Sequence, residues 1–283
     1  MKLQHLSTAR VERAGVRTPV DISRFLYSPG RKLLGLTIKI VNRPGALLTT
    51  LEVISRRYRV NILHIDASSR PEDTEVTVFY ILDLTDLPLD VRKLVSELRE
   101  LDTVLDVEVI EPILPGFVYD TARFPVLVSG RRAVILDELL LRGLSEFRKR
   151  YGSVASALLY YQGYSIGQRL QRAYVEEYPS YRTPQEMVQV LRARFQAMGL
   201  GVLEVAGASY DTNGYRVVLR MHECFECRVL ERGEERAPVC HFVRGLLAGF
   251  FTALLRAKTG TCTERACTVQ GSPYCEFEVT VQQ

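Results

Sequence analysis

The cysteines constrain the fold of this chain more than any other feature, because all six lie after residue 223 of 283. An apolar helical pattern begins at Cys240, and a predicted hairpin that carries Glu264, Cys267 and Cys275 follows it. The helix and the hairpin are short and must pack together. Thiolates and a carboxylate form a mixed ligand set that suits tetrahedral zinc. These four residues are therefore candidate ligands of a metal ion.

The spacing within the hairpin sets a condition on such a site. Cys267 and Cys275 are symmetric about Gly271, so they can be cross-strand neighbours. Glu264 precedes Cys267 by three residues, and in a regular strand the two side chains would face opposite sides. The site therefore requires a bulge or a strand end near Arg265. With Glu264 as fourth ligand no water is left to activate, which favours a structural metal over a catalytic one.

Other uses of the cysteines remain open. Cys224 and Cys227 have the C-x-x-C spacing that both zinc sites and redox sites use, so a thiol-redox switch is one alternative. Cys227 and Cys240 could also join other thiols, and Cys262 is then spare. Buried, inert thiols are a third interpretation. In a hyperthermophilic host, a disulfide between Cys267 and Cys275 is a fourth.

Composition limits the class of protein. The chain is 47% hydrophobic and 25% charged, and its length is typical of two globular domains. The net charge of +4 is scattered, with no basic run of the kind that binds nucleic acid. No apolar run is long enough to span a membrane, and residues 1–30 do not resemble a signal peptide. We therefore expect a cytoplasmic protein that contacts neither nucleic acid nor membrane directly.

The first half of the chain predicts a small α+β domain. Residues 1–31 are polar and are interpreted as an arm, with a possible strand at 20–27. Residues 32–112 follow the order β-α-β-β-α-β of a ferredoxin-like domain. Their predicted elements are strands 33–41, 60–68, 75–84 and 104–110 and helices 46–58 and 88–101. Prolines and a glycine mark residues 113–123 as a linker.

Residues 32–111 resemble an ACT domain, a regulatory module that binds amino acids or other small ligands. The resemblance rests on the run Asn42-Arg43-Pro44-Gly45-Ala46-Leu47 after the first strand and on Asn61, which opens the second. It implies that this loop and Asn61 contact a ligand, in many members across a dimer interface. Gly45 would let a ligand approach the backbone near free N–H groups of a helix start. Serine-binding members carry histidine where this chain has Ile40. A turn that serves only the fold or dimerisation is the alternative.

The second half, residues 124–283, predicts a mixed α/β domain with helices packed on an antiparallel sheet. Residues 124–136 form either two strands around Ser129-Gly130 or a strand that leads into a helix, and Thr183-Pro184-Gln185-Glu186 is a capping box that starts a helix. Gly163 and Gly167 on one helix would provide a smooth track for close packing or for a ligand. The other predicted elements are helices 139–151, 153–175 and 238–257, strands 200–210 and 215–223, and the hairpin 260–281.

Residues 124–281 resemble the 4-vinyl-reductase domain, which also forms the sensory domain of phenol-responsive transcription activators. The resemblance rests on residues 158–167, residues 238–249, Glu264-Arg-Ala-Cys267 and Cys275-Glu-Phe277. It implies a zinc ion held by a cysteine at a helix start and by Glu, Cys and Cys in the hairpin. In this chain those positions are Cys240, Glu264, Cys267 and Cys275.

Together these observations predict a ligand-sensing regulatory homodimer rather than an enzyme. An amino acid would bind the ACT-like half. A hydrophobic or aromatic molecule would bind between helices 153–175 and 238–257 and the sheet. The output would pass through a partner protein. A reductase-type enzyme is the rival interpretation, although no dinucleotide-binding motif and no base–nucleophile pair stand out. A scaffold that only assembles is the third.

Overall fold

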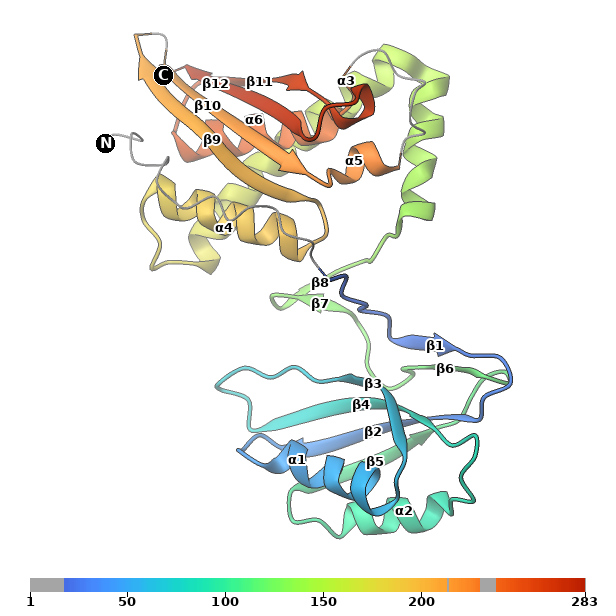
Figure 1. Ribbon diagram of the computed structural model, residues 1–283. Helices are drawn as coiled ribbons and strands as arrows, with labels where there is room; N and C mark the ends of the chain where they lie inside the picture. The colour runs from blue at the N-terminus through green and yellow to red at the C-terminus, as the bar shows by residue number, and fades with distance from the viewer. Residues whose placement is uncertain (1–17, 213, 230–237, 283) are drawn as a thin grey trace. The chain divides into compact units, whose positions relative to one another are not determined.

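The structure is a computed structural model that describes residues 18–212, 214–229 and 238–282 (Figure 1). It is an α+β protein with two antiparallel four-stranded sheets. The described residues up to Val134 form one compact unit, and those from Ile135 onward form a second. No helix within the described ranges is both long and apolar enough to cross a membrane.

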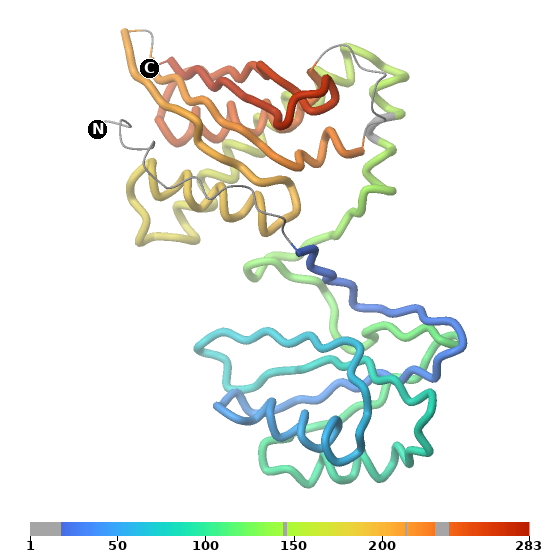
Figure 2. Tube along the Cα trace, viewed as in Figure 1, coloured from blue at the N-terminus to red at the C-terminus, as the bar shows by residue number. Residues whose placement is uncertain are grey.

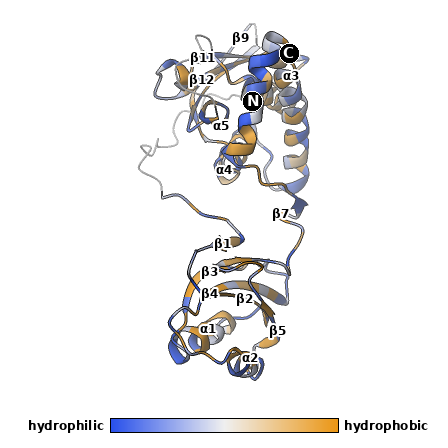
Figure 3. Ribbon diagram, turned by 90° about the vertical axis from the view of Figure 1, so that its right-hand side faces the viewer, coloured by the Kyte–Doolittle hydropathy of each residue, from blue (hydrophilic) through white to orange (hydrophobic). Residues whose placement is uncertain are grey.

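The N-terminal unit has the ferredoxin-like βαββαβ order. Its sheet has the strand order β3-β4-β2-β5 and is antiparallel throughout. One face is covered by α1 (Ala46–Leu51), which continues as a π-helical turn over Glu52–Arg57, and by α2 (Val91–Arg99). Figure 3 shows the apolar residues along β2 and β4 that form this core. The strands are β2 (Leu33–Val41), β3 (Asn61–Asp66), β4 (Glu75–Asp83) and β5 (Val104–Ile110).

The other face of this sheet is covered by residues predicted to be an arm and a linker. β1 (Phe25–Tyr27) pairs with β6 (Phe117–Tyr119), and Leu26 and Val118 pack on Phe79 and Ile81. A further hairpin, β7 (Leu127–Val128) with β8 (Arg131–Arg132), precedes the division at Val134. Both flanking segments thus bury apolar side chains on the sheet and belong to the compact unit that ends at Val134. The rest of the predicted arm, residues 1–17, lies outside the described ranges.

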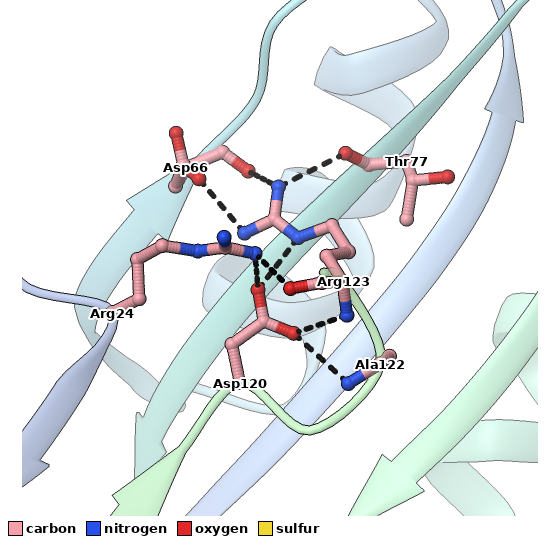
Figure 4. A network of polar contacts seen from close by, with 6 residues as sticks. All are labelled: Arg24, Asp66, Thr77, Asp120, Ala122 and Arg123. Atoms are coloured by element: carbon pink, nitrogen blue, oxygen red, sulfur yellow. Dashed lines mark hydrogen bonds and ion pairs between the residues drawn. The ribbon is translucent and has the colours of Figure 1, made fainter. Parts of the chain in front are cut away.

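A polar network fastens these flanking segments to β3 and β4 (Figure 4). The buried carboxylate of Asp120 accepts hydrogen bonds from Arg24 and Arg123. Arg123 also reaches the carboxylate of Asp66 at 2.8 Å and the carbonyl oxygen of Thr77 at 3.4 Å. Burial raises the pKa of Asp120, but the two guanidinium groups outweigh it and hold that pKa below its ordinary value.

The C-terminal unit packs helices on a sheet of strand order β11-β12-β10-β9. A 40-residue helical stretch, α3 (Glu138–Glu177), is broken at Gly152, whose φ of 51° and ψ of −124° are not helical. This break confirms the two helices predicted there. Thr183 and Glu186 form the predicted capping box of α4 (Pro184–Ala197). The remaining elements are β9 (Val202–Asp211), β10 (Gly214–His222), α5 (Phe225–Arg228), α6 (His241–Leu254), β11 (Thr259–Ala266) and β12 (Cys275–Gln282).

Helices α3 and α6 touch through their backbones. Gly163 and Gly167 of α3 face Gly245 and Gly249 of α6. A Cβ on Gly245 would lie 2.8 Å from the carbonyl carbon of Tyr160, and one on Gly167 would lie 2.7 Å from the amide nitrogen of Phe250. The trace in Figure 2 shows α3 and α6 running side by side. The glycine track therefore serves close packing, and along this seam no room exists for even a methyl group.

Candidate metal centre

Four elements of the C-terminal unit deliver five donor residues to one place. Cys240 is the N-cap residue of α6, and Cys227 lies in α5. Glu264 belongs to β11, Cys267 directly follows that strand, and Cys275 opens β12. The register of β11 on β12 shifts between Glu264 and Ala266, which leaves Arg265 as an extra residue. This is the bulge that the hairpin spacing required.

The donor atoms of these five residues all lie within 4.8 Å of one another, and every one of the five residues is buried. The Sγ atom of Cys227 lies 3.1 Å from that of Cys240 and 3.4 Å from those of Cys267 and Cys275. The Sγ atoms of Cys240 and Cys275 are 3.8 Å apart. Sulfurs bound at 2.3 Å to one tetrahedral zinc ion would be separated by about 3.8 Å, so the cluster has nearly the dimensions of such a site.

The structure thus brings together the four residues that the sequence predicts, and it adds Cys227. The C-x-x-C spacing was the signal for Cys227, but the short helix α5 that carries it to the cluster was not predicted. Cys224 lies 3.5 Å from Cys240, sulfur to sulfur, yet it is not among the five mutually close donors. Cys262 is buried elsewhere on β11, and burial raises its pKa. Metal binding by these residues stays a prediction.

Two buried glutamates satisfy the N-terminal backbone of α6. Glu226 accepts hydrogen bonds from the amides of Phe242 and Val243, both at 2.9 Å. Glu264 accepts one from the amide of Cys240 at 2.9 Å through Oε2. The first amides of a helix have no partner within the helix and carry partial positive charge, so carboxylates are stabilised there. Because both carboxylates are buried, the pKa of Glu226 rises to about 7 and that of Glu264 to about 9.

The thiols of the cluster differ in acidity. Hydrogen bonds from Cys227 and Cys240 lower the pKa of Cys267 to about 6. Hydrogen bonds from Cys224 and Cys227 lower the pKa of Cys275 as well. Thiol neighbours raise the pKa values of Cys227 and Cys240, with burial adding to the rise. Among the described residues Glu264 Oε1 is a buried oxygen without a hydrogen-bond partner. Thiolates beside an unpartnered carboxylate oxygen fit a bound divalent cation.

The predicted ligand loop of the N-terminal unit is held by contacts within the chain. Asn42 donates hydrogen bonds to the carbonyl oxygens of Asp73 at 2.8 Å and Arg70 at 3.4 Å. Arg43 forms an ion pair with Asp102 at 2.6 Å. After Pro44, Gly45 is the residue directly before α1, and its φ is 87°. Ala46 and Leu47 begin α1, with Ala46 buried and Leu47 exposed.

Asn42 and Asn61 do not meet within one chain. Val41, the residue before Asn42, pairs with Glu75 at one end of β4, whereas Asn61 pairs with Asp83 at the other end. Nine residues of β4 separate those ends by about 26 Å at the usual rise along a strand. One small ligand therefore cannot touch both asparagines of the same chain. Whether this loop binds a ligand stays a prediction.

Comparisons with known proteins find similarity in parts of the chain. An uncharacterized protein of Methanocaldococcus jannaschii is 26% identical over 131 residues, which are 46% of this chain and 68% of the relative. The phenol-responsive sensory domain of the transcription activator PoxR, solved with phenol, is similar at a TM-score of 0.47 and 19% identity, over 54% of this chain and 78% of that one.

The ACT domain of a GTP pyrophosphokinase of Chlorobium tepidum is similar at a TM-score of 0.25 and 22% identity, over 28% of this chain and 99% of that one. The sequence profile of the 4-vinyl-reductase domain family matches residues 217–281. The chain therefore carries a 4-vinyl-reductase domain, and all five donor residues of the candidate metal centre lie within it.

Proposed function

We propose that this protein is a cytoplasmic ligand-sensing regulator, not an enzyme, whose 4-vinyl-reductase domain is held together by a structural zinc ion. The observation that carries the proposal is the group of five buried donors, contributed by α5, α6, β11 and β12. These elements follow one another along the chain, and the sheet and α6 form the core of the unit. A metal there would cross-link the core rather than meet a substrate.

The donor set supports a structural role for the metal. Cys240, Cys267 and Cys275 would supply three ligands, and Glu264 or Cys227 would supply the fourth. A zinc ion that takes all four ligands from the protein has no open position for water or substrate. The chemistry the ion supplies when bound is a set of strong, geometrically fixed bonds to thiolates. The closed, buried setting favours a sensor or scaffold over a hydrolase or reductase.

The proposed ligand of the 4-vinyl-reductase domain is a hydrophobic or aromatic small molecule. The backbone contact between Gly163 and Gly167 of α3 and Gly245 and Gly249 of α6 leaves no space for it between the two helices at these glycines. A ligand at this seam would have to separate α3 from α6 and so would bind a different state of the domain. Differential binding of this kind is what lets a ligand shift a conformational equilibrium.

The N-terminal unit is proposed to be an ACT domain that binds an amino acid at a homodimer interface. The opposite placement of Asn42 and Asn61 supports a site shared between two copies, because one chain cannot offer both to one small ligand. Ligand binding would then strengthen association of the two copies. The resulting change would pass to a protein partner.

Elemental analysis and ligand titration test the proposal together. We expect one equivalent of zinc in the native protein, and a rise in Tm with phenols, fatty acids or amino acids as ligand is added. Static light scattering with and without amino acids would report whether a dimer forms. Native protein without metal, or catalytic turnover of a candidate substrate with a reductant, would overturn the proposal.

A thiol-redox switch is the second candidate, favoured by the 3.1 Å separation of the Cys227 and Cys240 sulfurs. Two thiols would join as a disulfide and pass two electrons and two protons to hydrogen peroxide, which becomes two waters. As an alternative to the predicted pair of Cys224 with Cys227, the Cys227 sulfur would join that of Cys240. Mass spectrometry of peroxide-treated protein would find that crosslink if the switch exists.

A further inference from the structure

We propose that Cys227 is a ligand of the metal and that the centre consists of four thiolates, from Cys227, Cys240, Cys267 and Cys275. Glu264 is then a positioning residue that holds Cys240. This inference rests on the proposed metal site and specifies its ligands. It replaces the carboxylate of the expected set by a thiolate that arrives from α5.

The position of the Cys227 sulfur carries the argument. It is 3.1 to 3.4 Å from the other three sulfurs, so it caps the triangle that they form. Non-bonded heavy atoms of ordinary size pack best at about 3.5–4.0 Å, and sulfur is larger than carbon. The three contacts of the Cys227 sulfur are therefore closer than unbonded packing favours, and none of the six cysteines forms a disulfide. All four sulfurs lie within 4.8 Å of one another, near the separation of about 3.8 Å that a tetrahedral zinc ion imposes, so one cation could bond to each after a small adjustment.

Glu264 has a role without being a ligand. Its Oε2 accepts the amide hydrogen of Cys240 at 2.9 Å, which fixes the backbone from which the Cys240 sulfur enters the cluster. A residue that hydrogen-bonds the backbone of a metal ligand orients that ligand. The other oxygen of Glu264, Oε1, has no hydrogen-bond partner and could take the fourth position on the metal in place of Cys227. An experiment that counts the sulfur ligands of the metal distinguishes the two.

A thiolate from α5 would also join that helix to the metal. Glu226, the residue before Cys227 in α5, already accepts hydrogen bonds from the first amides of α6. With Cys227 on the metal, α5 is held at two adjacent residues. Arg228 adds an ion pair to Glu138 of α3 at 2.6 Å. The metal would thus bind α5 between α6 and the β11–β12 hairpin, which the expected ligand set would not do.

Cys224 provides a matched control for Cys227. Both are in the same C-x-x-C motif, and both are buried, with exposed fractions of 1% and 7%. Cys224 lies 3.5 Å from Cys240, sulfur to sulfur, and also contacts Cys227 and Cys275, but it is not one of the five mutually close donors. Replacing either cysteine by serine removes one buried thiol, but only Cys227→Ser removes a sulfur from the group of mutually close donors.

X-ray absorption at the zinc edge, on the purified full-length protein, tests the inference. We expect four sulfur scatterers at about 2.3 Å and no oxygen at 2.0–2.2 Å in the wild type, in Cys224→Ser and in Glu264→Gln. Cys227→Ser should show three sulfurs and one light atom. It should also lose zinc to a chelator at least tenfold faster than Cys224→Ser.

Two other outcomes have separate meanings. Three sulfurs and one oxygen in the wild type, unchanged in Cys227→Ser, would assign the fourth position to Glu264 and overturn this inference while leaving the proposed zinc site intact. A native protein that neither contains nor takes up zinc would overturn both. If Cys227→Ser fails to fold, the sulfur count of the wild type and of Glu264→Gln still decides between the two ligand sets.

Discussion

At the scale of single residues, the C-terminal unit depends on buried carboxylates placed at one helix end. Glu226 accepts two backbone amides of α6, and Glu264 accepts a third. Hydrogen bonds to a charged group contribute more to folding stability than hydrogen bonds between neutral groups, and their loss destabilises the protein more when the group is buried. The exposed Glu186 of α4 also accepts two backbone amides, but through the single oxygen Oε2 and without burial.

Glu226→Gln should lower the free energy of unfolding of the C-terminal unit by about 1–3 kcal/mol. Glutamine keeps one oxygen that accepts a hydrogen bond from one backbone N–H group. Its NH2 group faces the other backbone N–H group, so neither of these two donors has an acceptor. Glu186→Gln, at an exposed helix start, should cost less than about 1 kcal/mol. Urea unfolding followed by circular dichroism measures both. Equal losses in the two variants would contradict the argument from burial.

Tyr80 should make the N-terminal unit sensitive to alkaline pH. Burial raises the pKa of Tyr80 to about 12, and its hydroxyl group lies 2.7 Å from that of Thr50. The folded state therefore keeps the proton that the unfolded state loses above about pH 10. Stability should be full below pH 10 and should fall by about 2–3 kcal/mol between pH 10 and pH 12.

Tyr80→Phe should remove this slope while adding a constant loss for the missing hydrogen bond to Thr50. The measurement is the free energy of unfolding in urea at pH 9, 10, 11 and 12 for both proteins. The difference between wild type and variant should shrink as pH rises. A difference that stays constant across this range would show that Tyr80 ionises equally in the folded and unfolded states.

At the scale of elements, the regular parts of the fold could be predicted and the irregular connections could not. Leu33–Val41 alternates and is rich in β-branched and apolar residues, and it forms β2 over the predicted range. α5 has only four residues, too few for a helical period, so Cys227 could not be placed beside Cys240. The three-residue strand β6 is similarly short, and it forms because an apolar side chain finds a sheet face that the local sequence does not reveal, whereas β1 lies within the strand suggested at 20–27.

The α3–α6 seam is the element contact most sensitive to one added methyl group. Gly245→Ala would place its Cβ 2.8 Å from the carbonyl carbon of Tyr160 and 2.9 Å from the amide nitrogen of Tyr164. Because both neighbours are backbone atoms, the helices must separate, at a cost of about 3 kcal/mol or more. Calorimetry of the C-terminal unit measures this loss.

Gly143→Ala is the matched control, since Gly143 is also helical but has nothing within 4 Å of its Cβ position. Alanine there should stabilise α3 by about 0.5–1 kcal/mol because it removes the conformational freedom of glycine. If Gly245→Ala were as stable as Gly143→Ala, the two helices would not be in backbone contact in solution.

At the scale of the whole molecule, the two units have separate cores, and the described cysteines lie in only one of them. The core of the N-terminal unit is built from aliphatic side chains and Tyr80, with no cysteine among its residues. The core of the C-terminal unit includes Cys227, Cys240, Cys267 and Cys275. A metal bound by those thiols would stabilise only the unit that contains them, because binding energy adds to the folding of the bound part.

Removing the metal with a chelator should therefore lower the stability of one unit alone. At a free zinc concentration a thousandfold above Kd, binding contributes about 4 kcal/mol, so its removal should expose the amides of β10, α6 and β12 to hydrogen exchange. The amides of β2 and β4 should keep their protection. Mass spectrometry of deuterated peptides reads the two units in one sample, and chelator saturated with zinc is the control. Simultaneous loss of protection in both units would mean that the N-terminal fold depends on the C-terminal one, and the metal would then govern the whole chain.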